Sequence, residues 1–307
     1  MGESGLVVSV VGVGCNNFGR RIDRDAAVAV VRSAIEEGVT LFDTADSYGT
    51  PRGASEQILG EALKGGRDDV IVATKFGQDL QGVNGADWGA RGSRRYVRRA
   101  VEASLRRLDT DWIDLYQMHF PDGKTPIEET LSALTDLVRE GKVCYIGCSN
   151  VAAWQVADAA WTATSAGLTG FVSVQNEYSL LDRSIEAEVV PACERFGLGV
   201  LPYYPLAQGL LSGKYRRGEP ARVGTRLVAQ PEALDAADWD TIDALTEYAA
   251  RRGRSLLDVA IGGLAAQPVV GSVIAGATTP EQVRANVAAG EWIPTADDLA
   301  ALDDITR

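Results

Sequence analysis

The stretch Leu41-Phe42-Asp43-Thr44-Ala45-Asp46-Ser47-Tyr48-Gly49 decides how this sequence folds. Its apolar beginning predicts a short buried strand that ends at Asp43, and Tyr48 follows five residues later in a polar turn. An aspartate is ionised near pH 7, whereas a tyrosine with an ordinary pKa of about 10 is a weak acid until a nearby positive charge lowers that pKa. A carboxylate and a phenol beyond one strand end therefore suit proton transfer.

Two further predicted strands end in chemically active residues. Residues 70–75 form an apolar run that ends in Lys75, and residues 112–118 lead directly to His119, the only histidine of the chain. Taken alone, a strand-end aspartate is usually a turn residue, and a single histidine usually packs at the rim of a core. Four different chemical groups at the exits of three successive strands are far less expected by chance, so we interpret them as one catalytic set.

Short β-branched strands alternate with alanine-rich helical segments along almost the whole chain. We expect eight strands, at residues 8–13, at the run into Asp43, and at 70–75, 112–118, 143–148, 171–175, 199–203 and 272–275. Helical periodicity is expected at residues 25–37, 55–64, 94–108, 127–140, 151–162, 184–196, 239–252 and 280–289. Eight βα units predict an α/β fold of the (β/α)8 TIM-barrel class.

We expect residues 1–307 to form a single domain in which three features interrupt the repeat. Long loops follow the third strand, at residues 77–92, and the seventh strand, at residues 208–234. A C-terminal tail after residue 291 carries a short helix that begins near Thr295. Loops of this length are often binding loops, and loops that follow barrel strands line the active site.

Composition excludes several classes of function. The net charge is −12 without a basic stripe, which disfavours nucleic-acid binding. No apolar run is long enough to span a membrane and no signal peptide opens the chain, so we expect a cytoplasmic location. The four cysteines lack CxxC spacing and are expected to be buried small hydrophobic residues. With a single histidine, no metal site is expected. The sequence leaves the oligomeric state undetermined.

Gly12-Val13-Gly14 follows the first strand and resembles the start of a dinucleotide-binding fingerprint. The third glycine position is Asn17, and helical periodicity begins only near Asp25. The fingerprint requires a helix that starts at the glycines. A dinucleotide, if one binds, must therefore bind in another way.

Later strand exits carry groups that suit a flat, polar ligand. Tyr203 and Tyr204 follow the seventh strand and can stack on a flat ring. Ser149-Asn150 and Gln175-Asn176 end two other strands, where side-chain amides can recognise a carboxamide. Near the eighth strand, Thr279 before Pro280 predicts a helix N-terminus, which is a favourable place for an anion.

Together these stretches resemble the aldo-keto reductase superfamily over nearly the whole chain. The resemblance lies in Phe42-Asp43-Thr44-Ala45, Tyr48-Gly49, Ser55-Glu56, Thr74-Lys75, Leu105–Asp114 leading to His119, Gly147, Ser149-Asn150, Gln175-Asn176 and Tyr203–Leu206. It implies a (β/α)8 barrel that binds a nicotinamide dinucleotide without a Rossmann domain. It also implies reduction of aldehydes and ketones to alcohols, usually with NADPH.

The resemblance implies roles for individual residues. Tyr48 is expected to protonate the carbonyl oxygen, Lys75 held by Asp43 to lower the pKa of Tyr48, and His119 to orient the carbonyl. Residues expected to bind the cofactor are Ser149, Asn150, Gln175, Tyr203, Tyr204, Pro205, Leu206, Gln208, Gly209, Leu211, Lys214, Gly276, Thr278, Gln282 and Asn286. Beside Tyr48, a substrate pocket for a small carbonyl or alcohol is expected to be walled by Phe18, Trp88, Phe120 and Tyr215.

The sequence departs from the family at the adenosine end of the expected cofactor site. Many members place Lys and Arg there, but these positions are Gly276 and Gln282, and Arg284 is shifted along the helix. NADP(H) is favoured by the resemblance and NAD(H) is possible, so we expect a smaller NADPH preference than in relatives that carry the cations.

Three other functions compete with a reductase. Some relatives oxidise sugars or alcohols with NAD(P), and others sense the cofactor as regulatory subunits. Lys75 at a barrel strand end would also suit a Schiff-base lyase. The order of Asp43, Tyr48 and His119 argues for the reductase.

Overall fold

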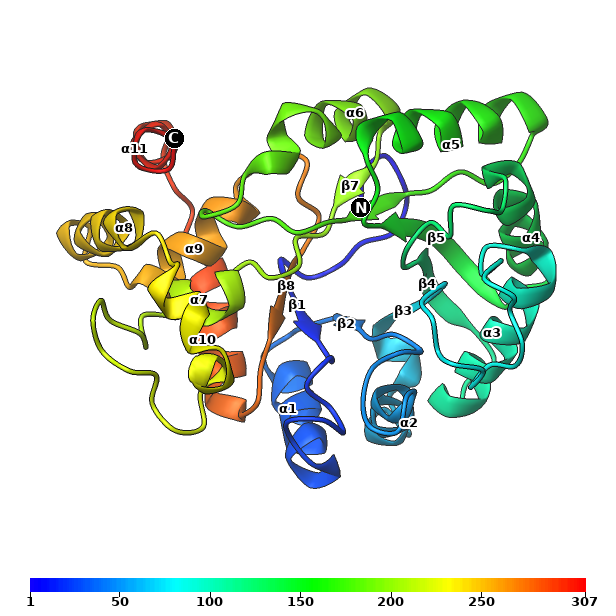
Figure 1. Cartoon of the computed structure of the whole chain (residues 1–307), viewed down its shortest axis with the longest axis horizontal. Helices are drawn as coiled ribbons and strands as arrows, with labels where there is room; N and C mark the ends of the chain where they lie inside the picture. The colour runs from blue at the N-terminus through cyan, green and yellow to red at the C-terminus, as the bar shows by residue number, and fades with distance from the viewer.

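The computed structural model describes residues 1–307 and contains one eight-stranded parallel sheet. The strands are β1 (Val11–Gly14), β2 (Leu41–Asp43), β3 (Ile71–Phe76), β4 (Ile113–Met118), β5 (Val143–Ser149), β6 (Ser173–Gln175), β7 (Gly199–Val200) and β8 (Val273–Gly276). They pair in the order β7-β6-β5-β4-β3-β2-β1-β8 (Figure 1). All eight predicted strands are therefore present.

The sheet closes on itself between its first and last members. Val200 donates its backbone N–H to Val269 at 2.7 Å and accepts from Gly271 at 2.9 Å, and Ile274 donates to the Pro202 carbonyl at 3.1 Å. These bonds join the β7 side of the sheet to the β8 side. The predicted (β/α)8 barrel is confirmed.

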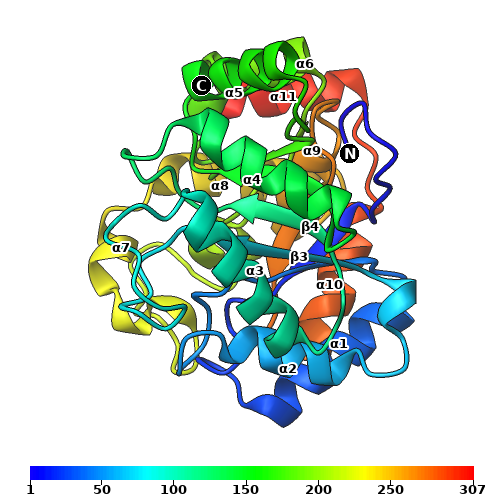
Figure 2. The ribbon, with the colours of Figure 1, turned by 90° about the vertical axis from the view of Figure 1, so that its right-hand side faces the viewer.

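Helices surround the sheet, and α1 to α6 follow one another around it in chain order, as the colours from blue to green in Figure 1 show. They are α1 (Arg24–Glu36), α2 (Ala54–Ala62), α3 (Arg94–Leu108), α4 (Ile127–Arg139), α5 (Ala153–Ala166), α6 (Val189–Phe196), α7 (Pro231–Asp235), α8 (Trp239–Arg251), α9 (Leu256–Ala265), α10 (Pro280–Gly290) and α11 (Ala296–Ile305). Figure 2 shows α3 and α4 lying over β3 and β4. No helix is both long and apolar enough to cross a membrane.

The barrel interior is built in layers because successive strand side chains point to opposite faces. One apolar layer joins Leu6 from the N-terminal segment to residues from five strand segments, which are Leu41, Ala73, Leu115, Leu201 and Ile274. Two residues further along, β2, β3 and β4 place the buried polar side chains of Asp43, Lys75 and Gln117, and β6 adds Gln175. The apolar layer therefore supports a polar layer at the carboxyl ends of the strands, where active sites of this fold lie.

Two hydrophobic clusters hold the helices in place. The larger one contains 50 buried residues from the strands and the barrel-facing sides of the helices. A second cluster of 11 residues joins α8, α9 and the C-terminal segment through side chains such as Leu245, Val259, Trp292 and Leu302. The tail is therefore anchored, and the helix predicted from Thr295 is present as α11, with Thr295 as its N-cap.

Two predictions about local structure need correction, and helices α7 and α9 were not predicted. The helix expected at residues 184–196 is a 3₁₀ turn at Ser184–Ala187 followed by α6, because Pro191 fits only the first turn of a helix. Helix α9 was not predicted, since Gly262 and Gly263 weaken its helical pattern. Cys144 is exposed, whereas the other three cysteines are buried; all four are free.

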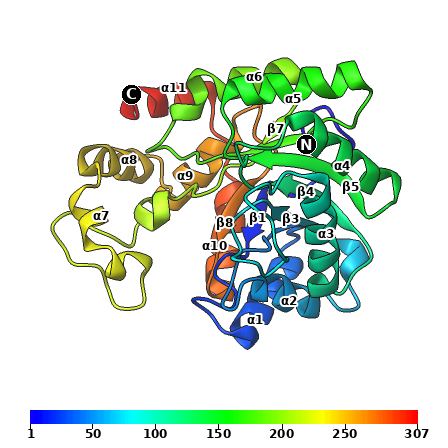
Figure 3. The same cartoon turned by 45° about the vertical axis from the view of Figure 1, so that its right-hand side comes forward.

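The long loops predicted after the third and seventh strands are both present. Residues 77–93 connect β3 to α3, and residues 201–230 connect β7 to α7 through two short 3₁₀ turns. Figure 3 shows the second loop and α7 extending beside α8 and α9. Both loops leave the carboxyl ends of their strands, which is the end that carries the polar layer.

Candidate active site

Asp43 and Lys75 form a buried ion pair at the ends of β2 and β3. The Lys75 ammonium donates to Asp43 Oδ2 at 2.6 Å, to the Thr44 carbonyl at 2.8 Å and to the Tyr48 hydroxyl at 3.4 Å. The side chain of Lys75 is fully buried. A charge inside a protein must be paired and hydrogen-bonded, and all three contacts of this ammonium are polar.

Two amides complete the surroundings of the Asp43 carboxylate. Gln117 of β4 and Gln175 of β6 donate to Asp43 Oδ1 at 3.2 and 2.9 Å. Gln117 was not predicted as a site residue, although its spacing of two from Leu115 places it on the inner face of the strand. Four strands thus contribute to one hydrogen-bonded network that fixes the orientation of the Asp43–Lys75 pair.

The protonation states in this network are set by burial and by the ion pair. Burial raises the pKa of Tyr48 above its ordinary value, and the Lys75 charge acts against this rise. For Lys75, burial disfavours the ammonium, but the Asp43 carboxylate and the Tyr48 phenol outweigh it and leave the Lys75 pKa raised. At neutral pH the network therefore holds a phenol that keeps its proton beside a permanent ammonium.

His119 lies directly after β4 and faces Tyr48 with ring centroids 5.9 Å apart and planes at 83°. It stacks on Phe120 at 4.9 Å. Burial, followed by repulsion from Lys75, lowers the pKa of His119 well below its usual 6.5. The imidazole is therefore neutral at physiological pH, and its buried Nδ1 has no hydrogen-bond partner in the protein.

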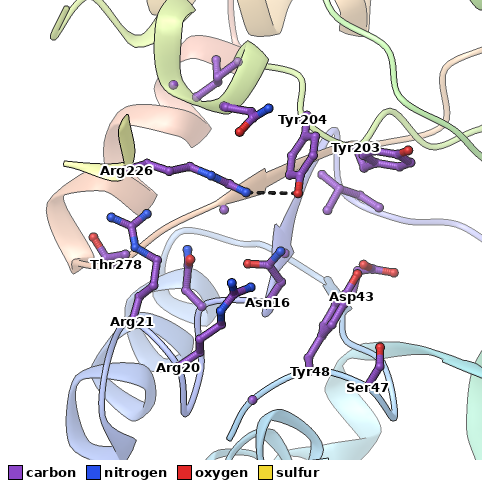
Figure 4. Close-up of a pocket in the computed structure, with 18 of the residues that line it drawn as sticks. Asn16, Arg20, Arg21, Asp43, Ser47, Tyr48, Tyr203, Tyr204, Arg226 and Thr278 are labelled. Carbon is purple, nitrogen blue, oxygen red and sulfur yellow. Dashed lines mark hydrogen bonds between the residues drawn. The ribbon is translucent and has the colours of Figure 1, made fainter. Parts of the chain in front are cut away.

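A cavity of about 870 Å³ opens above these groups, which is the size of a typical ligand site. Three of the four predicted catalytic residues line it, which are Asp43, Tyr48 and His119, and Lys75 lies beneath Tyr48. Most residues predicted for the cofactor also line it, namely Ser149, Asn150, Gln175, Tyr203, Tyr204, Pro205, Leu206, Gln208, Gly209, Lys214, Gly276, Thr278 and Gln282. Figure 4 shows Tyr48 and Asp43 at one end and Thr278 at the other.

The remaining predicted residues lie away from the cavity wall. Leu211 is buried in the cluster around α8 and α9, and Asn286 is buried on α10. Of the aromatic residues expected around the substrate, only Phe120 lines the cavity. Phe18 belongs to the main core, and Tyr215 packs on Leu227 and Leu234. Trp88 is 71% exposed and lies against Arg95.

Next to His119 and Tyr48, the cavity presents the polar groups expected to meet a nicotinamide. Asn150 donates to the His119 carbonyl at 3.0 Å, and its Oδ1 accepts from the Tyr203 hydroxyl at 2.8 Å. Asn150, Tyr204, Ala207 and Gln208 all adopt positive φ angles, an uncommon conformation for residues other than glycine. Such residues cluster at functional sites. The cavity thus combines an aromatic surface, side-chain amides and an acid–lysine pair, which fits a nicotinamide cofactor.

Sequence reasoning did not predict a second group of lining residues. They come mainly from the loop after β1, the turn after Tyr48 and the loop after β7, and include Asn16, Asn17, Arg20, Arg21, Ser47, Thr50, Arg52, Gln78, Thr225 and Arg226. These loops have no sequence periodicity from which one could predict which side chains face the cavity. Only the fold brings them together, and the positive charge of the arginines was therefore not recognised. No three His, Cys, Asp or Glu side chains are grouped so that they could hold a metal ion.

A parallel barrel with this acid–lysine–tyrosine–histidine set defines a nicotinamide-dependent oxidoreductase class of site, and comparison with known proteins agrees. The model of the Aldo/keto reductase family matches residues 10–307. A Bacillus subtilis (strain 168) protein named Uncharacterized oxidoreductase YrpG is 36% identical, covering 99% of this chain and 94% of its own length.

Two further relatives differ from each other in their stated roles. A probable voltage-gated potassium channel subunit beta of Oryza sativa subsp. japonica is 35% identical over 96% of this chain and 91% of its own length. The L-glyceraldehyde 3-phosphate reductase of Escherichia coli O157:H7 is 32% identical over 98% of this chain and 90% of its own length. The chain belongs to the aldo/keto reductase family, and it is an NAD(P)H-dependent oxidoreductase.

Proposed function

We propose that the chain reduces an aldehyde or ketone to an alcohol, with NADPH as the favoured hydride donor and Tyr48 as the general acid. The observation that carries this proposal is the contact of the Tyr48 hydroxyl with the buried Lys75 ammonium at 3.4 Å, at the floor of a cavity that His119 also lines. The phenol, the ammonium and the imidazole converge at one end of that cavity.

The residues meet the electrostatic demands of the reaction. A bound nicotinamide cofactor supplies the hydride, and negative charge then develops on the carbonyl oxygen. Tyr48 donates its proton to that oxygen, while Lys75 stabilises the phenolate that remains. Donors fixed in advance at a developing charge lower the barrier, by about 3–4 kcal/mol for one donor in known cases. Neutral His119 orients the carbonyl without adding a competing charge.

The cavity suggests how the cofactor is oriented. The nicotinamide belongs beside Tyr203, Ser149, Asn150 and Gln175, because hydride transfer requires it to lie near Tyr48. The rest of the dinucleotide then extends along the loop after β7, past Gly209 and Lys214, toward Gly276, Thr278 and Gln282.

Ser47, Gln78 and Phe120 line the same cavity as Tyr48 and His119, so it offers hydrogen-bonding groups as well as an aromatic ring to a substrate. A polar aldehyde or ketone suits such a lining, in agreement with the E. coli relative, whose name states a phosphorylated aldehyde. Two alternatives remain to be tested: an alcohol or sugar dehydrogenase that works in the oxidative direction, and a cofactor-sensing subunit like the rice relative.

A Tyr48→Phe substitution tests the proposal because it removes only the hydroxyl. Reduction of a panel of small aldehydes and ketones should slow by at least about two orders of magnitude, since a positioned general acid contributes 10²–10⁴-fold. Affinity for NADPH, measured by fluorescence titration, should stay within a few-fold. The control is Tyr145→Phe at the opposite end of the barrel, where Tyr145 packs against the apolar layer.

Near-normal turnover of Tyr48→Phe would refute the assignment of the acid. Assays of the same panel as alcohols determine the direction of the reaction. A wild type that binds NADPH but turns over no carbonyl or alcohol would support the regulatory alternative instead.

A further inference from the structure

Five cations line the cavity of this acidic protein, and none of them has an acidic partner. Arg20, Arg21, Arg52, Lys214 and Arg226 line it, whereas Asp43 is the only lining carboxylate and is paired with Lys75. No carboxylate lies within ion-pair distance of any of the five, although the chain has 42 acidic and 30 basic residues. Unpaired cations grouped in a cavity create a strong positive potential, which attracts an anion.

Three of these cations gather at the end of the cavity remote from Tyr48. Figure 4 shows Arg21 and Arg226 near Thr278, on the side opposite Tyr48 and Asp43. Arg21 reaches from the loop after β1 to the Gly224 carbonyl in the loop after β7, at 3.5 Å. Burial lowers the pKa of Lys214, and repulsion from Arg21 and Arg226 lowers it further, so the three positive charges are close enough to repel one another.

The charged end of the cavity is the adenosine end of the proposed cofactor site. The nicotinamide must lie at Tyr48, and an elongated dinucleotide that fills the cavity then places its pyrophosphate near the middle and its adenosine near Thr278. The adenosine 2′-phosphate is the group that distinguishes NADPH from NADH. It carries up to two negative charges at neutral pH, like other phosphate monoesters.

The positions where cations were expected cannot supply this charge. Gly276 has no side chain, and the Gln282 Oε1 accepts from the Thr278 amide and hydroxyl at 2.9 and 3.1 Å. Arg284, the shifted cation on α10, pairs with Glu281 at 2.9 Å and contacts Ser33 on α1, outside the cavity. Arg21 and Arg226, by contrast, line the cavity at this end.

We propose that Arg21, from the loop after β1, binds the 2′-phosphate of NADPH opposite Arg226 and thereby selects NADPH over NADH. This inference rests on the proposed function, and it moves the selecting cation from the start of α10 to a loop more than 250 residues earlier in the chain. Arginine suits the role because its planar fork binds phosphate oxygens in pairs. Arg226 is partly engaged with Tyr204, donating to its hydroxyl at 3.0 Å, which leaves Arg21 as the freer group.

The test compares the dissociation constants of NADPH and NADH for wild type and Arg21→Gln at one fixed salt concentration. Arg21→Gln should weaken NADPH at least tenfold and change NADH less than twofold. The nucleotides 2′,5′-ADP and 5′-AMP should show the same difference without any nicotinamide. The matched control is Arg32→Gln, which removes one exposed cation from α1 outside the cavity and should change neither constant.

A variant that adds a cation provides a second test of the proposal. Gly276 has an ordinary backbone conformation, and an added Cβ would meet only Asn17 Nδ2 at 3.4 Å and the Gly14 carbonyl at 3.9 Å. Gly276→Lys can therefore be introduced without strain. In the Arg21→Gln background it should restore most of the lost NADPH affinity and leave NADH unchanged.

The possible failures are distinguishable. Equal weakening of NADPH and NADH in Arg21→Gln would overturn the inference, because Arg21 would then act on the pyrophosphate or on the loop. Unchanged NADPH affinity would overturn it as well, since the 2′-phosphate would be bound elsewhere. A wild type that binds neither cofactor would instead overturn the proposed function.

Discussion

Replacing Lys75 by Met keeps the length of the side chain and removes its charge, so it isolates the electrostatic part of the proposed mechanism. The ammonium lies 3.4 Å from the Tyr48 hydroxyl. At an effective dielectric constant of about 20, a unit charge at this distance stabilises a phenolate by about 5 kcal/mol. Asp43 at 2.6 Å from the ammonium cancels part of this. If half of this stabilisation remains in wild type, its loss in Lys75→Met lowers the rate by about two powers of ten, because each 1.36 kcal/mol corresponds to about a factor of ten.

The same substitution leaves Asp43 as an unpaired buried carboxylate, which commonly costs about 3–5 kcal/mol of stability. Activity and stability therefore need to be separated. The double variant Lys75→Met/Asp43→Asn removes both charges, so its unfolding free energy should recover a large part of that loss. Its carbonyl reduction, followed by cofactor absorbance, should remain low.

The direction of the pH effect follows from the same pair. Without Lys75 the pKa of Tyr48 rises, because the group that acts against the effect of burial is gone. Alcohol oxidation requires the phenolate as a base, so its activity should appear only at higher pH than in wild type. Recovery of activity in the double variant, or an unmoved pH profile for oxidation, would refute the role of Lys75.

Two further predictions concern single residues. His119 is the only histidine, so ¹⁵N-histidine labelling yields the two ring-nitrogen signals of a single imidazole, and these should report a neutral ring at pH 6 and 7 because burial lowers its pKa. In the unfolded chain His119 takes up a proton near pH 6.5, whereas in the folded protein it stays neutral at that pH. The free energy of unfolding should therefore decrease as the pH falls below about 6.5. His119→Gln should remove this contribution to the pH dependence. Gly60→Ala should destabilise the protein by about 1–3 kcal/mol in denaturant unfolding, because its Cβ would collide with the backbone carbonyl of Leu108 where α2 packs on α3. The control Gly66→Ala has open space and should change the unfolding free energy by less than about 0.5 kcal/mol.

The fold could be predicted because its signals are local and repeated. Each strand is a short apolar run and most helices have a 3.6-residue period, so the eight units are visible one at a time. Helix α9 was missed because its glycines oppose the local propensity. The structure explains one of them: a Cβ on Gly262 would lie 2.8 Å from the Trp292 carbonyl, so close packing with the C-terminal segment requires glycine. Tertiary contact outweighs propensity at this position.

From the local sequence pattern alone, the candidate site was predictable only where it lies on strand ends, and lining residues in loops, such as Gln208 and Lys214, were expected only from the family resemblance. Four strands each place one side chain on the inner face of the same polar layer, because strand side chains alternate between faces with a period of two residues. These side chains are Asp43, Lys75, Gln117 and Gln175. Gln117 could have been found by this rule, since it lies two residues after the inward-facing Leu115. The aromatic residues expected around the substrate were chosen from loops, where no period specifies direction. Trp88 accordingly lies on Arg95 instead of facing the cavity.

The cations at the adenosine end show why a site can depart from its family without losing its chemistry. Asp43 and Lys75 are fixed by the pairing of neighbouring strands, and a shift of one residue would turn either side chain to the other face of the sheet. The adenosine end is built from loops, which tolerate change because few backbone pairings depend on them. A cation can therefore be lost at Gly276 and supplied at Arg21, provided that the charge reaches the same point in the cavity. On the proposed assignments, cofactor preference in this chain would depend on loop charges, whereas proton transfer would depend on groups that the barrel strands position.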